Sequence, residues 1–404
     1  MTDSPRADVV AKQYEKWTYP EPIQNLETWA ANNWQWFDPS HAHRLLWPDR
    51  PLRADIDILI AGCGTNQAAQ IAYNNRAAKV VAIDVSQPSL DHEKFLKDKY
   101  ALKNLELHLL PIEEAPSLNQ KFDLVMSTGV LHHMDNPKAG MKALAEVMRP
   151  DGVAAIMLYA RYGRSGVEWM QAIFRDMGLR QDEESLQMVK AAIASLADTH
   201  PVKSYISIAP DLNFDAGVVD TFLHGRDKSF TVDDCLELVT SAGLVFQDWF
   251  LKSPYYPATL VEPGNEFYAG VAQLPAKNIW SVMERVNTLN GCHFFLATHA
   301  GRPTSSYRID FSAPDARDYV PLFRLRCGVG GQDVYRYDWT VRLDPTHLAF
   351  AQYINGELSI REIAERVAQS GLVSADQSEL ELIALELFEG LWRFDFIAID
   401  LSGG

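Results

Sequence analysis

Short apolar runs alternate with stretches of helical periodicity between residues 57 and 160. Five of the runs have the length and residue types of buried strands, and turn residues bound them. These runs are 58–60, 80–83, 105–109, 124–126 and 153–157, and the segments between them, such as 66–75, 88–100 and 137–148, have helical patterns. Regular alternation of buried strand and helix predicts an α/β fold whose doubly wound, mostly parallel sheet is covered on both faces.

Two departures from this rhythm, an insertion and an aromatic leader, predict part of the domain organisation. Helical sequence of mixed polarity at about 161–235 predicts an insertion over the carboxyl edge of the sheet, before strand-like runs return at 244–251 and 293–297. The first fifty residues are rich in aromatic rings and prolines, which must cover either the core or a ligand cavity. We therefore expect an aromatic N-terminal lid over 1–50 and a main domain over 51–305.

The tail over 306–404 follows a linker of Gly, Pro, Ser and Thr residues. Two pairs in it, Ser359 with Glu362 and Ser378 with Glu381, have the spacing of capping boxes. Helices are thus expected at 359–369 and 378–391, and alternating apolar residues near 394–398 indicate a strand. This order predicts a small acidic C-terminal α+β domain, for which a winged-helix-like arrangement is one form.

Charge and composition narrow the classes of partner. The 404 residues carry 37 basic and 53 acidic side chains, a net charge of −16. Binding to nucleic acid or anionic membrane needs clustered Lys and Arg, so neither partner is expected. No apolar run reaches the length of a membrane-spanning helix, and the first residues lack the pattern of a secretion signal, which predicts a cytoplasmic protein. The four cysteines are scattered and indicate neither disulfides nor zinc.

The most informative stretch is Ala-Gly-Cys-Gly-Thr at 61–65, where a buried strand runs into a glycine turn and then a helix. Glycines let a turn be tight and let a ligand approach the backbone. Gln67 stands where a dinucleotide fingerprint has its third glycine, which weakens the case for a nicotinamide or flavin. Asp84 ends the next strand, where an acid can accept both hydroxyls of a ribose. The alternative is a pair of turn glycines and a helix cap.

Two further motifs suggest a family. One is Phe122-Asp123, whose strand runs into Gly-Val-Leu-His-His at 129–133, and the other is the Arg-Pro-Asp-Gly turn at 149–152. Together with the glycine loop and Asp84, they make residues 55–160 resemble the class I S-adenosylmethionine-dependent methyltransferases, which have a Rossmann-like sheet. The likeness continues more weakly to about residue 300 and indicates a bacterial branch with a C-terminal accessory domain.

The resemblance implies a set of cofactor contacts. The glycine loop would wrap the methionine part and ribose of S-adenosyl-L-methionine, and Asp84 would bind the ribose hydroxyls. Val85 would pack on adenine, whose amino group would be read near Glu113, although the commoner pattern has an Asp about where Pro111 stands. The residues so implied are Gly62, Cys63, Gly64, Thr65, Asp84, Val85, Ile112, Glu113, Gly129 and Val130.

Catalytic candidates follow from the chemistry of methyl transfer, which needs alignment and, at times, removal of a proton. Tyr14 and Tyr19 in the leader and Tyr159 after the fifth strand could shape the acceptor side. Asp220, His224 or His132 could act as base. Arg161, Tyr162 and Arg164 are further candidates for the acceptor side, and each group has a packing or ion-pair alternative. Adjacent His132 and His133 converge poorly on one ion, so no metal is expected.

These features predict a methyltransferase that acts on a small or medium-sized organic acceptor by in-line transfer. A protein or peptide methyltransferase that recruits its substrate through the C-terminal domain is one alternative. A non-catalytic sensor that binds S-adenosylmethionine is another. The sequence contains no motif that identifies the acceptor.

Overall fold

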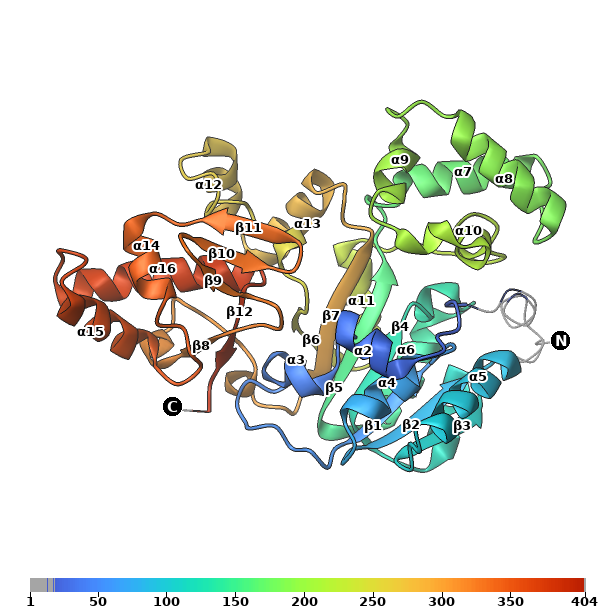
Figure 1. Ribbon diagram of the computed structural model, residues 1–404, viewed down its shortest axis with the longest axis horizontal. Helices are drawn as coiled ribbons and strands as arrows, with labels where there is room; N and C mark the ends of the chain where they lie inside the picture. Colours follow the sequence, from blue (N-terminus) through green and yellow to red (C-terminus); the bar gives the residue numbers. More distant parts are fainter. Residues whose placement is uncertain (1–12, 14–16, 18, 403–404) are drawn as a thin grey trace. The chain divides into compact units, whose positions relative to one another are not determined.

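The computed structural model describes Gln13, Trp17 and residues 19–402 (Figure 1). Tyr14 therefore lies outside the described residues. Contacts between Cα atoms divide the chain into two compact units, described separately below. The first contains the chain up to Phe37 with 53–248 and 284–302, and the second contains 38–52, 249–283 and 303 onward. The second unit thus includes two segments besides the tail expected at 306–404.

The first unit is built on one seven-stranded sheet in the described part of the chain, with strand order β3-β2-β1-β4-β5-β7-β6. Neighbouring strands from β3 to β5 pair in parallel, and β7 runs antiparallel to β5. This sheet confirms the α/β, mostly parallel fold expected from the sequence. The strands are β1 (Asp57–Ala61), β2 (Lys79–Asp84), β3 (Leu105–Leu109), β4 (Phe122–Thr128), β5 (Met148–Tyr159), β6 (Leu244–Trp249) and β7 (Cys292–His299).

Helices flank this sheet between successive strands (Figure 1). Ile58, Leu59 and Ile60 of β1 are completely buried, which explains why the strand reads as a continuous apolar run and not as an alternating pattern. The flanking helices include α4 (Gln67–Asn74), α5 (Gln87–Lys99), α6 (Pro137–Glu146) and α11 (Val232–Ser241). The first three match the helical stretches predicted from the sequence to within a few residues.

The insertion forms a helical subdomain with its own apolar core. Its core includes Val167, Phe174, Leu186 and Val219, all nearly inaccessible to solvent. Figure 1 shows its helices gathered beyond the end of β5. They are α7 (Ser165–Asp176), α8 (Glu183–Ser195), α9 (Pro201–Ile206), the short η4 (Pro210–Asn213) and α10 (Asp215–Phe222).

The second unit contains two small antiparallel sheets and several helices. One sheet pairs β8 (Val320–Phe323) with β12 (Ile397–Asp400), and the other contains β9 (Gly328–Gly330), β10 (Asp333–Arg336) and β11 (Trp339–Arg342). The helices of the tail are α14 (Pro345–Ala351), α15 (Ile360–Ser370) and α16 (Gln377–Arg393), and α3 (Pro39–Leu46) and α12 (Glu266–Ala272) come from earlier segments. The tail is thus α+β, as expected, with more strands than the sequence indicated.

The two predicted capping boxes have different outcomes. Ser359 and Glu362 form a reciprocal capping box at the start of α15, which confirms that prediction. The second box is wrong, because Asp376 caps α16 by accepting the backbone N–H of Glu379. Glu381 instead pairs with Arg317 at 2.7 Å. Two helix-start signals overlapped in this stretch, and the aspartate two residues upstream supplies the cap.

Candidate active site

The glycine loop joins the ends of β1 and β2. Gly62 and Gly64 have positive φ angles of 80° and 57°, which residues with a Cβ rarely adopt. The backbone N–H groups of Gly62 and Cys63 both donate to Ile83 O, at 2.8 and 3.2 Å. Asp84 Oδ2 accepts the N–H of Gly64 at 2.9 Å. The loop is therefore tied to the end of β2 on both sides of its turn.

A third strand end meets the same loop. Gly129 follows β4 with φ of 76°, and its N–H donates to Met157 O of β5 at 3.3 Å. A Cβ added to Gly62 would overlap the side chain of Val130. The carboxyl ends of β1, β2 and β4 therefore converge where an open α/β sheet binds its ligand. Gly62, Asp84, Gly129 and Val130, all predicted cofactor residues, lie together in this way.

Two buried carboxyl groups lie behind the loop. Burial raises the pKa of Asp84, although its oxygens accept backbone N–H groups of Gly64 and Ser86. Glu93 is fully buried and accepts the N–H groups of Ala68 and Ala69, each at 2.8 Å, at the start of α4. Burial raises the pKa of Glu93 to about 8. Sequence reasoning missed Glu93, because only the fold brings α5 against the N-terminus of α4.

The described part of the leader lies on the glycine loop. A Cβ on Gly64 would come within 2.9 Å of Pro20 Cδ and 3.5 Å of Tyr19 O. Thr65 Oγ1 donates to Pro20 O at 2.8 Å. The predicted cofactor residue Thr65 thus holds the leader in place, and a glycine at position 64 lets the leader approach the loop closely.

Two tyrosines and two aspartates lie beyond the loop on the insertion side. Tyr19 Oη donates to Asp211 Oδ2 at 3.0 Å, and Tyr159 Oη donates to Asp220 Oδ2 across a longer 3.4 Å. Gln13 Nε2 also donates to Asp220 Oδ1, at 3.2 Å. Burial and the nearby carboxylates raise the pKa of both tyrosines well above the usual value. Tyr19 and Tyr159 are therefore protonated donors to carboxylates.

Asp211 is a residue that sequence reasoning missed. It lies in η4, within the helical insertion, 192 residues after its partner Tyr19. No local motif marks it, and only the packing of the insertion against the leader reveals its place. Asp220 in α10 was predicted, and it is almost completely buried.

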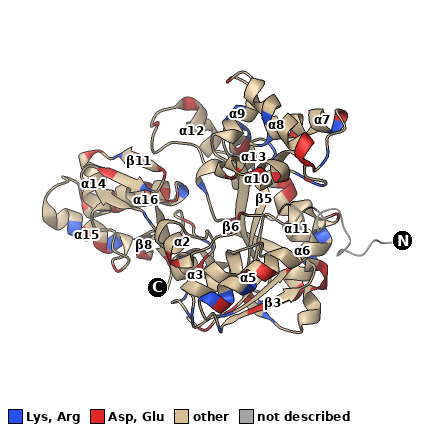
Figure 2. Ribbon diagram, turned by 45° about the vertical axis from the view of Figure 1, so that its right-hand side comes forward, with Lys and Arg blue, Asp and Glu red and all other residues tan. Residues whose placement is uncertain are grey.

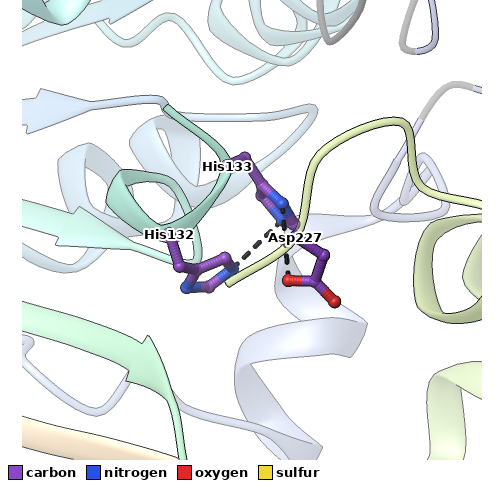
Figure 3. A group of neighbouring side chains, drawn as sticks. All are labelled: His132, His133 and Asp227. Atoms are coloured by element: carbon purple, nitrogen blue, oxygen red, sulfur yellow. Dashed lines mark hydrogen bonds and ion pairs between the residues drawn. The ribbon is translucent and has the colours of Figure 1, made fainter. Parts of the chain in front are cut away.

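The histidine pair has a defined pattern of donors and acceptors (Figure 3). The backbone N–H of Tyr159 donates to His132 Nδ1 at 3.2 Å, so a neutral His132 carries its proton on Nε2. That Nε2 lies 3.1 Å from His133 Nε2, and His133 Nδ1 lies 3.0 Å from the carbonyl oxygen of Arg226. His133 thus carries its proton on Nδ1 and accepts from His132. Burial lowers the pKa of His132, which keeps it neutral.

Metal binding competes with these hydrogen bonds. Two sets of side chains place possible ligand atoms within 4.8 Å of one another: His132, His133 and Asp227, and His133, Asp220 and His224. His224 Nδ1 accepts the N–H of Arg226 at 3.0 Å, so a neutral His224, like His132, has its proton on Nε2. A metal would need a lone pair on these rings in place of a proton or a backbone partner. That no metal binds here stays a prediction.

Arg164 organises the ring of Tyr159. Its completely buried guanidinium lies 3.6 Å from the centre of that ring, and the imidazole of His132 stacks at 3.8 Å, so the ring is held between them. Arg164 Nη2 donates to Asp227 Oδ2 at 2.9 Å, and Nη1 donates to Tyr205 Oη at 2.5 Å. The ion pair with Asp227 compensates the cost of burying the arginine charge.

The remaining predicted residues differ in burial and in their partners. Cys63 is buried within the loop, Val85 is half-buried after β2, and Ile112 is buried at the start of the short helix Ile112–Leu118. Glu113 is exposed. Arg161 and Tyr162 point elsewhere: Arg161 donates to Ser229 O, and Tyr162 Oη accepts from Arg285.

These features fit S-adenosylmethionine as a ligand. Gly62 and Gly64 of the loop carry no Cβ, and Asp84 supplies an acidic group beside the loop. Residues 52–197 match the model of a family described as "Methyltransferase domain". The match contains the glycine loop, Asp84, Gly129 and Tyr159.

Several curated proteins are similar in sequence. An uncharacterized protein of Synechococcus is 24% identical over 90% of this chain and 88% of its own length. A malonyl-[acyl-carrier protein] O-methyltransferase of Acetivibrio thermocellus is 28% identical over 34% of this chain and 47% of its own length. A ubiquinone biosynthesis O-methyltransferase of Neisseria meningitidis is 28% identical over 30% of this chain and 55% of its own length. The chain thus matches about half the length of these two methyltransferases.

The fold extends the similarity to almost the whole chain. PKMT2 from Rickettsia typhi, solved in complex with AdoHcy, superposes with a TM-score of 0.64 over 95% of this chain and 77% of its own. The two sequences are 14% identical, so this likeness concerns the fold. Residues 52–197 therefore contain a methyltransferase domain, and this match together with the sheet and the glycine loop supports a class I S-adenosylmethionine-dependent methyltransferase, which implies S-adenosylmethionine as the cofactor.

Proposed function

We propose that the protein transfers the methyl group of S-adenosylmethionine to a small or medium-sized organic acceptor held between the leader and the helical insertion. The observation that supports this proposal is the pairing of Tyr19 with Asp211 at 3.0 Å, because it links the leader to the insertion beside the glycine loop. Such a bridge encloses the acceptor side, which suits a compact substrate.

The cofactor supplies a methyl group already activated on a sulfonium. The protein's part is therefore to orient the acceptor and exclude water, with reacting atoms held about 3–3.5 Å apart. Tyr159 is fixed for this task by Arg164 and His132. Pro20 and Tyr19 cover the glycine loop from the other side. On this proposal Tyr159 and the half-buried Tyr19 and Pro20 would border the acceptor.

Charge supports this choice of acceptor over nucleic acid. The chain has a net charge of −16, and helices α5, α8 and α15 each carry acidic and basic residues together (Figure 2). Phosphate binding needs a surface where Lys and Arg gather. In the described part of the chain, no helix is both long and apolar enough to cross a membrane.

A polypeptide acceptor, recruited by the second unit, is the second candidate. It is favoured by the extent of the fold likeness, since the superposition on PKMT2 covers 95% of this chain and so includes the second unit. The second unit is therefore part of the fold that the two proteins share, which favours a functional role for it. On this hypothesis it would bring a protein segment to the site.

An unbiased transfer experiment tests both candidates. Purified protein is incubated with methyl-labelled S-adenosylmethionine and extract of the source organism, and small molecules are then separated from protein. We expect label in a small molecule. Label confined to protein would support the second candidate, and cofactor binding without any transfer would mean that the chain is a sensor and not an enzyme.

A further inference from the structure

The start of helix α4 is capped by a side chain from another helix. The first N–H groups of an α-helix have no partner within the helix and need an outside acceptor. Asn66 stands at the cap position of α4, but its side-chain oxygen accepts from Gln70 Nε2 at 3.2 Å, one turn into the helix. Glu93 of α5 supplies the cap instead, because its two oxygens accept the N–H groups of Ala68 and Ala69, each at 2.8 Å.

This cap lies directly behind the cofactor loop. Residues 65–67 separate Gly64 from Ala68. Asp84 Oδ2 accepts the N–H of Gly64 at 2.9 Å, and Glu93 Oε1 accepts the N–H of Ala68. One carboxyl group therefore fixes each end of this short segment, so loss of the Glu93 contact would free the chain that follows Gly64.

The corresponding N–H groups have a different partner in dinucleotide-binding folds. There the pyrophosphate of the ligand lies at the N-terminus of the helix that follows the glycine turn. In this chain the completely buried carboxyl group of Glu93 takes the N–H groups of Ala68 and Ala69. S-adenosylmethionine contains no phosphate, so the protein itself supplies the acceptor that stabilises the helix start.

Opposing effects act on the proton of Glu93. Burial and the negative charge of Asp84 favour the neutral acid and raise the pKa of Glu93 to about 8, whereas the two backbone N–H groups favour the carboxylate. The sequence of α4 contains no charged residue. The thiol of Cys63 also faces Glu93, and burial raises the pKa of that thiol. A positive charge bound on the loop would shift Glu93 toward the carboxylate.

We propose that Glu93 is a positioning residue for the cofactor: it holds the start of α4, and with it the segment after Gly64, and it becomes a carboxylate when the cationic cofactor binds. Its effect passes through the backbone of Ala68 and Ala69, and the proton that it loses goes to the solvent. The proposal goes beyond the proposed function, because it concerns cofactor binding and does not depend on the acceptor.

Proton release upon cofactor binding is the first test. Wild-type protein and Glu93→Gln are titrated with S-adenosylmethionine at pH 7 by calorimetry in two buffers of different ionisation enthalpy, which gives the number of protons released. We expect the wild type to release about one proton more than Glu93→Gln, because a group with a pKa of about 8 is mostly protonated at this pH. Glu93→Gln should also bind the cofactor roughly 10- to 150-fold more weakly, since an amide offers one oxygen to two N–H groups.

Formate provides a second test, of the cap itself. Glu93→Ala leaves the N–H groups of Ala68 and Ala69 without their acceptor and vacates the space of the carboxyl group. We expect cofactor binding to weaken by a similar factor and to recover by about 10-fold or more in formate, compared with chloride at equal ionic strength. Wild type and Glu93→Gln should not respond to formate, because a side chain fills that space.

Asp91→Asn is the matched control. Asp91 lies on α5 as Glu93 does, but it is exposed and accepts from Gln87 Nε2 at 2.8 Å. This variant should bind the cofactor and release protons as the wild type does.

The outcomes that would overturn the proposal are distinct from those for methyl transfer. Wild-type affinity in Glu93→Gln, or equal proton release by the two proteins, would show that Glu93 neither positions the loop nor responds to the cofactor charge. Affinity of Glu93→Ala that is unchanged by formate would show that packing, and not the carboxyl group, holds the loop. Each of these results would leave the proposed function standing, since the experiments involve no acceptor.

Discussion

Gly62 offers a direct test of how the strand ends meet, because an added methyl group there would strike a single neighbour. A Cβ at this position would overlap Val130 Cγ2 and approach Val130 Cγ1 to 2.9 Å. The backbone φ of 80° adds strain of about 1–2 kcal/mol for a residue with a side chain. Overpacking against a fixed neighbour costs about 1–3 kcal/mol. Gly62→Ala should therefore weaken cofactor binding by roughly 30-fold or more, because the loop must be forced back into place.

Val130→Ala should restore part of that loss. It removes Cγ1 and Cγ2 and leaves Val130 Cβ, 3.1 Å away, as the nearest atom of that side chain. The overpacking should be relieved, whereas the φ strain should remain. We expect a coupling of about 1–3 kcal/mol between the two substitutions, measured by titration calorimetry with S-adenosylmethionine on wild-type, single and double variants.

Gly243→Ala is the matched control for strain alone. Gly243 has φ of 74°, and no atom lies within 4 Å of an added Cβ. This variant should melt at a lower temperature and bind the cofactor normally. If the effects of Gly62→Ala and Val130→Ala on binding add to within about 0.5 kcal/mol, the two residues do not meet and the convergence of β1 with β4 is refuted.

Three further predictions concern buried charges of the same unit. Asp84→Asn should weaken cofactor binding roughly 10- to 150-fold, since about 1.5–3 kcal/mol of charge-assisted hydrogen bonding is lost. Unchanged affinity by calorimetry, in a variant with a normal circular dichroism spectrum, would reject a role of Asp84 in cofactor binding. Glu93 has a folded-state pKa of about 8, above its usual 4.5, so the folded form holds its proton longer than the unfolded chain does. The contribution of Glu93 to stability is therefore full below about pH 4.5 and falls as the pH rises to about 8. Across this range the melting temperature of Glu93→Gln should fall less steeply with pH than that of the wild type. An equal slope in the two proteins would contradict the prediction. Arg164→Met leaves Asp227 buried without its ion-pair partner and should destabilise the first unit by about 3–5 kcal/mol in denaturant titrations, whereas a loss below 1 kcal/mol would show that the pair is not buried in solution.

Local sequence was sufficient for the elements of the first unit. Strands buried on both faces must be continuously apolar, and the helices between them must be amphipathic, so periodicity alone located β1 to β5. The glycine loop and Asp84 were also readable, since positive φ angles and a strand-terminal acid are local requirements. The second unit was less predictable, because its segment from β8 to β11 consists of short strands whose patterns are too brief to read.

The contacts between the leader and the insertion depended on the tertiary structure. Asp211 has no motif of its own, and it became a candidate only because the insertion places it against Tyr19. The protonation of His132 and His133 could likewise not be assigned from the sequence. The partners that fix their tautomers, Tyr159 and Arg226, come from other segments. Sequence by itself determined the strands of the first sheet and the glycine turn, because each depends on neighbouring residues. The cofactor followed from the resemblance of the motifs to a known family. The pairing of Tyr19 with Asp211 and of Tyr159 with Asp220 was decided by long-range packing, which no local pattern records.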